Sequence, residues 1–257
     1  MCLAIVSAMA EENASLVRQM SDVEKIEAGR RIYHRGRLWG RDVVVVFSHW
    51  GKVAAASTVT LLITRFEATE IIFTGVAGAV DRSLNIGDIV VGTELYQHDM
   101  DVRPLIERHE IPLLAMTAMP SYVPRRALLA SAAQHYLDLH LVEQLPAEVI
   151  EEFSLRAPKV VQGGIASGDQ FISSEQCVED IRGRLPGVVC VEMEGGAVAQ
   201  VCTEFDIPFS VIRTISDSAN DQAAMDFPKF IVEVAQMYSL GIMNVLLMDL
   251  PPLPNAD

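Results

Sequence analysis

Residues 188–205 read VVCVEMEGGAVAQVCTEF, and this stretch indicates the fold class. Its first four residues, Val188 to Val191, form an apolar run typical of a strand buried on both faces. Gly195 and Gly196 follow, and small apolar residues then recur at helical spacing up to Phe205. A buried strand that leads directly into a helix is the repeating unit of an α/β sheet.

The same stretch places two acids, Glu192 and Glu194, directly after the predicted strand. A buried carboxylate without a partner costs several kcal/mol, so each of these acids needs a neighbouring group or a ligand. In open α/β sheets, ligands bind beyond the carboxyl ends of the strands. We therefore expect the functional residues at the strand ends.

Strands alternate with helices along most of the chain, which predicts a single α/β domain over residues 1–250 with a mixed, mostly parallel central sheet flanked by helices. The tail 251–257, PPLPNAD, is expected to be loose. The expected strands lie within residues 3–7, 30–40, 41–51, 70–80, 86–99, 159–173, 187–194 and 208–219. The expected helices lie within residues 8–20, 52–66, 120–141, 173–185, 195–205 and 227–250, with an insert at 142–157. The run 70–80 is expected to end in a glycine-rich turn.

Composition restricts the class of protein. The net charge is −14, from 20 basic and 34 acidic residues, and there is no Lys/Arg cluster, so nucleic-acid binding is not expected. The four cysteines form no C-x-x-C pair, which argues against a zinc site and suits a reducing compartment. The N-terminus lacks a positive start, and we find no apolar run approaching ~20 residues. We expect a cytoplasmic enzyme with no membrane partner.

The strand ends carry acids, one arginine, one aromatic ring and several glycines, in the segments 11–12, 74–78, 167–172, 192–194 and 213–217. No Walker motif, G-x-G-x-x-G or H-E-x-x-H occurs. Carboxylates can accept hydrogen bonds from two ribose hydroxyls, a phenyl ring can stack on a base, and further acids can donate a proton or activate water. The set indicates a neutral, hydroxyl-rich ligand with one aromatic face.

Eight segments, in order, resemble the nucleoside phosphorylase/hydrolase superfamily and, within it, the bacterial 5′-methylthioadenosine/S-adenosylhomocysteine nucleosidases. They span residues 8–217 and therefore most of the chain. The segments are AMAEE (8–12), GKVAAA (51–56), TGVAGAV (74–80), GDIVV (87–91), HDMDV (98–102), SGDQFI (167–172), VEMEGGAVAQVC (191–202) and IRTISD (212–217).

The resemblance implies hydrolysis of the N-glycosidic bond of 5′-thio-substituted adenosines by a homodimer without metal or organic cofactor. It implies that Glu12 is the general base for the attacking water and that Asp217 carries a proton to purine N7. It also implies that Glu194 binds the ribose 2′- and 3′-hydroxyls, Met193 packs under the sugar and Phe171 stacks on the base.

Further roles follow from the same resemblance. The backbone of Ile172 is implied to bind the edge of the base, and Glu192 and Arg213 to lie close to the water and the ribose. The remaining residues expected around the substrate are Trp50, Val76, Ala77, Gly78 and Ser216.

Three features depart from the nucleosidase pattern. Val76 stands where these nucleosidases usually have a small hydroxyl residue, and Trp50 stands where an aliphatic residue usually lines the 5′-substituent pocket. The segment 103–119 also differs, and the family implies that this region closes the pocket of the neighbouring subunit. These departures leave the preferred 5′ group open, but not the type of reaction.

Other interpretations remain. The same residues fit a nucleosidase for another 5′-substituted adenosine, such as aminodeoxyfutalosine, a purine nucleoside phosphorylase, or a non-catalytic nucleoside-binding protein. The acidic AMAEE segment favours water over phosphate, because phosphate requires cations there. His98, Asp99 and Asp101 do not by themselves specify a metal, and a structural hydrogen-bonding role is favoured for them.

Overall fold

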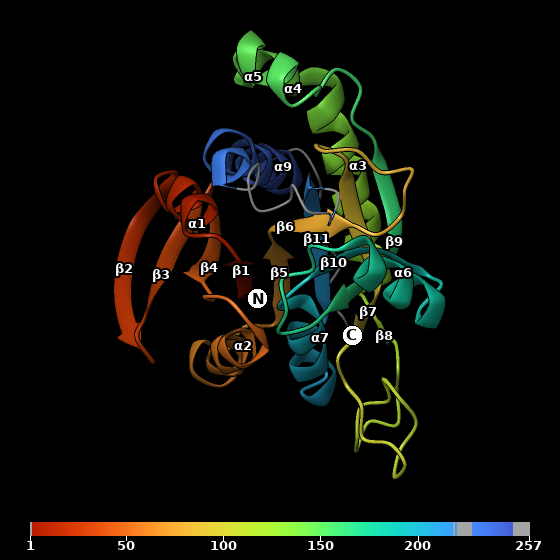
Figure 1. Ribbon diagram of the computed structural model, residues 1–257. Helices are drawn as coiled ribbons and strands as arrows, with labels where there is room; N and C mark the ends of the chain where they lie inside the picture. The colour runs from red at the N-terminus through yellow and green to blue at the C-terminus, as the bar shows by residue number, and fades with distance from the viewer. Residues whose placement is uncertain (1, 218, 220–227, 249–257) are drawn as a thin grey trace.

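The computed structural model describes residues 2–217, 219 and 228–248. Within them, eleven strands form one continuous sheet in the order β2-β3-β4-β1-β5-β11-β6-β10-β9-β7-β8, with an additional β11–β7 pairing (Figure 1). The strands are β1 (Leu3–Ser7), β2 (Met20–Ala28), β3 (Arg31–Leu38), β4 (Arg41–Phe47), β5 (Glu70–Thr74), β6 (Val76–Ala79), β7 (Ile89–Gln97), β8 (Met119–Pro120), β9 (Val160–Ser167), β10 (Val188–Glu192) and β11 (Phe209–Asp217).

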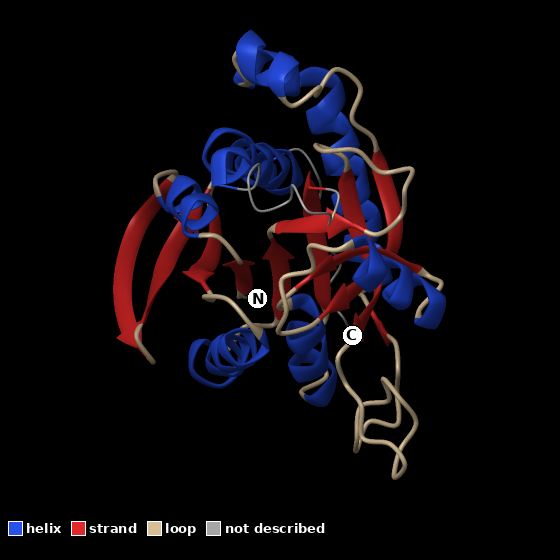
Figure 2. Cartoon of the chain, in the orientation of Figure 1, coloured by secondary structure: helices blue, strands red, loops and turns tan. Residues whose placement is uncertain are grey.

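The helices cover both faces of the sheet, as Figure 2 shows. α1, α3 and α9 enclose one apolar core with it, and α2 and α7 enclose a second. The helices are α1 (Ala10–Val17), α2 (Lys52–Phe66), α3 (Val123–Leu139), α4 (Leu141–Gln144), α5 (Ala147–Glu152), α6 (Glu175–Arg184), α7 (Gly195–Glu204), the π-helical turn η1 (Ile231–Ala235) and α9 (Gln236–Met248).

The mixed sheet with helices on both sides confirms the predicted fold class. The central strands β1, β5 and β11 are buried along their whole length, because helices cover both of their faces. β1 pairs in parallel with β4 and β5, and β11 pairs in parallel with β5 and β6. Antiparallel pairs occur at the β2–β3–β4 edge and where β6 and β7 join the sheet. The predicted loose tail lies outside the described residues.

Two local predictions are wrong. The first helix ends at Val17, and Met20, which was expected in that helix, begins β2, which pairs with β3. The run after β5 was expected to be a glycine-rich turn, yet β6 is a strand between β10 and β11. Between β5 and β6, Gly75 leaves no room for a side chain, because a Cβ there would lie 3.0 Å from the Ala8 Cβ and 3.3 Å from the Arg213 guanidinium carbon.

The C-terminal helix corrects one prediction from composition. Pro228–Met248 reaches the length and mean hydropathy, 1.6, that a membrane-spanning helix needs, although no such run was expected. Two thirds of that window is buried within the protein, where η1 and α9 pack against α1 and α3. A core helix of an α/β protein meets the same criterion of composition, so the hydropathy of this segment is explained by its burial.

Candidate active site

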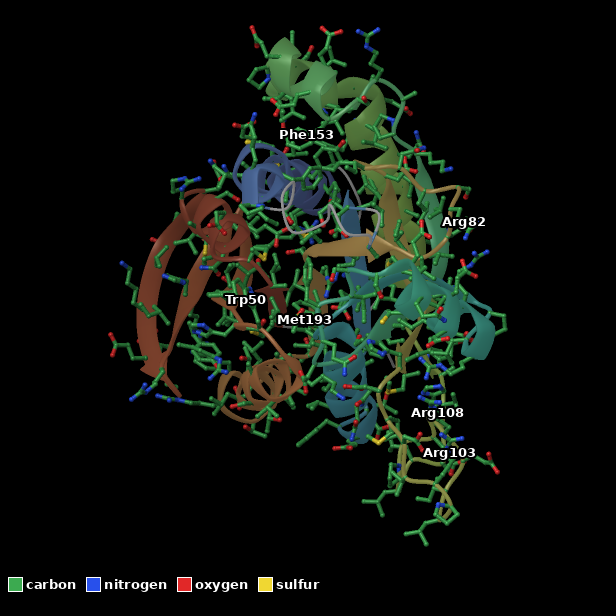
Figure 3. All side chains as sticks on the ribbon, viewed as in Figure 1. Trp50, Arg82, Arg103, Arg108, Phe153 and Met193 are labelled. Atoms are coloured by element: carbon green, nitrogen blue, oxygen red, sulfur yellow. The ribbon has the colours of Figure 1, made fainter. Side chains whose placement is uncertain are left out.

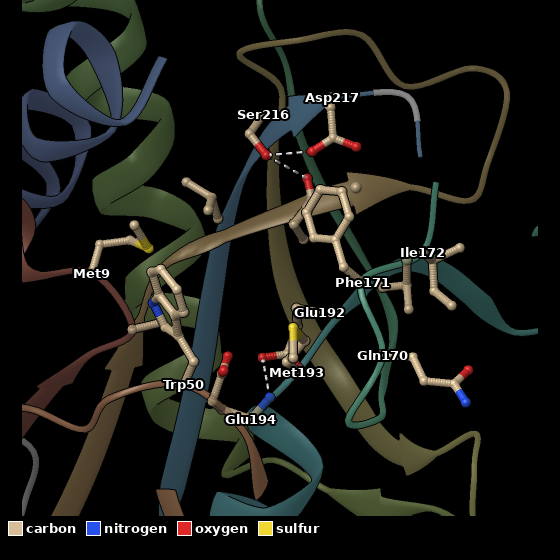
Figure 4. A pocket seen from close by; sticks show the side chains of 15 residues that line it. Met9, Trp50, Gln170, Phe171, Ile172, Glu192, Met193, Glu194, Ser216 and Asp217 are labelled. Atoms are coloured by element: carbon tan, nitrogen blue, oxygen red, sulfur yellow. Dashed lines mark hydrogen bonds between the residues drawn. The ribbon is translucent and has the colours of Figure 1, made fainter. Parts of the chain in front are cut away.

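A cavity of about 290 Å³ opens along β6 and where β10 and β11 end, beside the loop that follows β9 (Figure 4). All of the predicted site residues line it except Glu12 and Arg213. The sequence prediction missed four lining residues, although Met9 and Gln170 lie inside segments that carried the family resemblance. The lining residues are Ala8, Met9, Trp50, Val76, Ala77, Gly78, Gln170, Phe171, Ile172, Val191, Glu192, Met193, Glu194, Ser216 and Asp217.

Glu192, the last residue of β10, is fully satisfied by protein groups. Its carboxylate pairs with the Arg213 guanidinium at 2.7 Å and accepts hydrogen bonds from the Ser167 hydroxyl and the Gly195 backbone N–H. The Arg213 side chain is completely buried and also donates to the backbone oxygens of Phe73 and Ile212. Arg213 therefore lies behind the cavity, where it holds Glu192 in place.

Glu194 lies two residues further on, at the start of α7, and its carboxyl group faces the cavity. One carboxyl oxygen accepts a hydrogen bond from the Gly51 backbone N–H at 2.7 Å. Burial, and then the neighbouring charge of Glu192, raise the pKa of Glu194 well above its usual value. A ligand that donates hydrogen bonds to the Glu194 carboxylate would stabilise its charged form, and two ribose hydroxyls can do so.

Asp217 ends β11 on the other side of the cavity from Glu194 (Figure 4). Its two carboxyl oxygens accept hydrogen bonds from the Ser216 hydroxyl at 2.7 Å and from the Ala219 backbone N–H at 2.8 Å. Gly78 faces it closely, since a Cβ at position 78 would lie 2.9 Å from an Asp217 oxygen. The absence of a side chain at Gly78 leaves room for the Asp217 carboxylate at this position.

Glu12 is buried in the first turn of α1 and does not line the cavity, although Met9, one turn earlier, does. One of its oxygens accepts a hydrogen bond from the Ser239 hydroxyl of α9 at 2.7 Å, and the other is buried without a hydrogen-bond partner among the described residues. Burial raises the pKa of Glu12 to about 7, even though Ser239 and Arg213 favour its ionised form. A carboxyl group with such a pKa can exchange a proton at neutral pH.

Two aromatic side chains stand at the opening of the cavity. Trp50 is 66% exposed and Phe171 is 47% exposed, although both rings line the cavity. Trp50 and Met193 both line the cavity, and in the view of Figure 3 they lie away from the long loop that carries Arg103 and Arg108. Exposed rings at a cavity opening offer apolar surface that a bound ligand can cover.

The HDMD segment does not form a metal site within the described part of the chain, where no group of three metal-ligating side chains occurs. Asp99 accepts hydrogen bonds from Lys52 and from the Asp169 backbone, and Asp101 pairs with Arg103. The His98 ring packs against Gly168, whose added Cβ would lie 2.3 Å from it. The favoured structural role of this segment is consistent with these contacts.

Comparison with known proteins supports the family that the sequence resembles. Residues 3–243 match the model of the phosphorylase superfamily. The 5′-methylthioadenosine/S-adenosylhomocysteine nucleosidase of Colwellia psychrerythraea is 36% identical over 242 residues, which is 94% of each chain.

Two solved structures overlay on nearly the whole chain. A Colwellia psychrerythraea nucleosidase of the same name, in complex with adenine, has a TM-score of 0.80 at 34% identity and covers 96% of this chain and 94% of its own. The futalosine hydrolase of Helicobacter pylori has a TM-score of 0.82 at 29% identity, covering 97% and 98%. The chain thus belongs to the 5′-methylthioadenosine/S-adenosylhomocysteine nucleosidase family within the phosphorylase superfamily, and it is a purine N-glycosyl hydrolase for 5′-substituted adenosines.

Proposed function

We propose that this protein hydrolyses methylthioadenosine and S-adenosylhomocysteine to adenine and the corresponding thioribose. The observation that carries the proposal is that Glu194 and Asp217 face one cavity with an aromatic ring at its opening. The name of the Colwellia relative and the adenine bound to the solved homologue support the choice of substrate and product. We propose that this activity serves methionine salvage.

In the proposed mechanism the C1′–N9 bond breaks and the oxygen of a water molecule bonds to C1′. Asp217 donates a proton to purine N7, so that adenine leaves as a neutral molecule. Glu12 accepts a proton from the water. The sugar passes through a cationic, oxocarbenium-like state, and the carboxylates of Glu192 and Glu194 stabilise that charge more than they stabilise the neutral substrate.

The remaining lining residues hold the substrate in this proposal. Glu194 accepts hydrogen bonds from the ribose hydroxyls, and Met193 packs beneath the sugar. Phe171 stacks on the adenine, while the backbone of Ile172 binds the edge of the base. Arg213 acts through Glu192, because its guanidinium is occupied by that carboxylate and by backbone oxygens. The rest of the proposed contact surface is formed by Trp50, Val76, Ala77, Gly78 and Ser216.

Water rather than phosphate is the proposed attacking group. The cavity residues named above include three acids and no lysine or arginine. Phosphate binding requires cationic side chains or several free backbone N–H groups, and adjacent carboxylates repel it. The charges of the cavity therefore favour hydrolysis over phosphorolysis.

One observation favours a second candidate, a nucleosidase for adenosines with a larger 5′ group. The exposed indole of Trp50 and the aliphatic Val76 both line the cavity, at two positions where the chain departs from the nucleosidase pattern. A futalosine hydrolase is also among the similar structures, at 29% identity. An indole at the opening provides a flat apolar surface on which a bulky 5′ group can rest.

We further propose that the protein acts as a homodimer in the cytoplasm. The loop between Asp101 and Met119 extends from the body of the fold (Figure 1). Its Leu105 and Leu113 side chains are almost completely exposed. Exposed leucines on an extended loop suit contact with a second copy. Sedimentation at several protein concentrations tests this, and a monomer at all of them would contradict it.

Release of free base tests the proposed function. Methylthioadenosine, S-adenosylhomocysteine, adenosine, inosine and aminodeoxyfutalosine are each incubated with the protein, with and without phosphate. We expect adenine from the first two, at a rate that phosphate does not change. Preference for aminodeoxyfutalosine would support the second candidate, and dependence on phosphate would refute hydrolysis.

A further inference from the structure

The two loops that carry the aromatic rings of the cavity opening are joined by a closed set of hydrogen bonds. One loop leads into α2 and holds Trp50, Gly51 and Lys52. The other follows β9 and holds Asp169 and Phe171. The two loops lie more than a hundred residues apart in the sequence, as the separation of 117 between Lys52 and Asp169 shows.

Asp99, two residues after the end of β7, is the group that binds both loops. Its Oδ1 accepts from the Lys52 ammonium at 2.7 Å, and its Oδ2 accepts from the Asp169 backbone N–H at 3.0 Å. The Asp169 carboxylate in turn accepts from the Lys52 backbone N–H at 2.8 Å. Each loop is therefore held to Asp99 and also directly to the other loop.

Charge favours this arrangement. The Lys52 and Asp99 side chains are only 17% and 22% exposed, so their attraction is less screened than that of a surface pair. Burial alone would raise the pKa of Asp99, but the hydrogen bonds from Lys52 and Asp169 outweigh it and the pKa falls below its usual value. Asp169 and Glu194 also accept from the first two amides of α2, where the helix dipole favours anions.

The backbone at Gly51 connects this set to the ribose-facing acid. Gly51 has a φ of +91°, a backbone conformation that residues other than glycine rarely adopt. A Cβ at this position would also lie 3.0 Å from the Asp169 carboxylate. In that conformation its N–H donates to Glu194 at 2.7 Å. The position of the loop therefore decides both where the Trp50 ring stands and how the Glu194 carboxyl group is oriented.

We propose that Asp99 is a positioning residue for substrate binding, which fixes Trp50, Phe171 and Glu194 relative to one another through Lys52 and Asp169. This inference rests on the proposed function, since it concerns the same cavity. Both rings are largely exposed, so the loops that carry them contribute to the distance between them. The groups that perform the chemistry, Asp217 and Glu12, are held by other contacts.

The test is the steady-state kinetics of Asp99→Ala with methylthioadenosine. We expect KM to rise about tenfold, the effect of losing about one charge-assisted hydrogen bond, while kcat changes less than about threefold. Asp99→Asn keeps one oxygen acceptor but places an NH2 donor opposite either the Lys52 ammonium or the Asp169 N–H, so it should restore only part of the lost affinity. Asp101→Ala is the matched control, because that acid lies two residues away and pairs with Arg103 and Arg108.

A double-mutant cycle with Lys52→Met separates positioning from general loss of structure. If Asp99 acts through Lys52, the two substitutions together raise KM by much less than the product of their separate effects. Equal falls in kcat and kcat/KM, or an effect of Asp101→Ala as large as that of Asp99→Ala, would overturn the inference.

Binding provides a readout that needs no turnover. Calorimetric titration of methylthioadenosine into Asp217→Asn, with and without Asp99→Ala, should show weaker binding in the double variant. If the unaltered protein released no adenine from any nucleoside, the proposed function would fail, yet this titration would still decide the role of Asp99. Equal affinity in the two variants would refute that role.

Discussion

Glu12 provides the sharpest prediction, because its burial links stability to catalysis. The pKa of its carboxyl group is raised from 4.5 to about 7 by burial. The folded state therefore binds this proton more tightly than the unfolded state does, and ionisation of Glu12 destabilises the fold as pH rises. From these two pKa values, the destabilisation grows by roughly 2 to 3 kcal/mol between pH 5 and pH 9.

Glu12→Gln removes this titration while its amide oxygen can still accept the hydrogen bond from Ser239. Relative to the unaltered protein, the variant should therefore gain roughly 2 to 3 kcal/mol of unfolding free energy between pH 5 and pH 9. Urea denaturation at the two pH values measures the difference. Glu11→Gln is the control, since Glu11 is the neighbouring acid and is partly exposed. The reasoning fails if the stability difference between Glu12→Gln and the unaltered protein is the same at both pH values.

The same residue makes a kinetic prediction. As a general base, Glu12 must be ionised to accept the proton of water, so kcat/KM of the unaltered protein should rise with pH through about 7. Glu12→Gln should lower turnover by orders of magnitude while methylthioadenosine still binds. A profile of kcat/KM that is level between pH 5.5 and pH 8.5 would exclude this role for Glu12.

Three further substitutions test other parts of the site. Asp217→Asn should bind methylthioadenosine with nearly unchanged affinity in calorimetry but lose turnover by orders of magnitude, and near-full adenine release would exclude Asp217 as the acid. Trp50→Ile should change the ratio of kcat/KM between methylthioadenosine and adenosine more than it changes kcat, and an unchanged ratio would show that the indole does not contact the 5′ group. Arg213→Met should lower the unfolding free energy by about 3 kcal/mol, because it leaves the Glu192 carboxylate buried without its cation; a loss below about 1 kcal/mol in urea denaturation would contradict this.

The sequence alone determined most of the helices and strands, though not β2 or β6, and the identity of most cavity residues. Apolar runs such as 188–191 and the helical spacing after them are local patterns, so they predict β10 and α7 without knowledge of their neighbours. In a sheet of mostly parallel strands, the carboxyl ends of the strands lie at the same edge, so polar residues that follow those strands lie close together. This is why Glu194, Asp217 and Phe171 line the cavity as predicted.

Only the tertiary structure decided which groups are partners. Arg213 was expected near the water and the ribose, and the structure adds that its guanidinium pairs with the Glu192 carboxylate at 2.7 Å. Glu12 receives its hydrogen bond from Ser239, 227 residues away, in a helix whose sequence gave no indication of this role. The physical reason is that hydrogen bonds and ion pairs between distant segments depend on which elements are neighbours in space. Local patterns of hydrophobicity carry no information about that pairing.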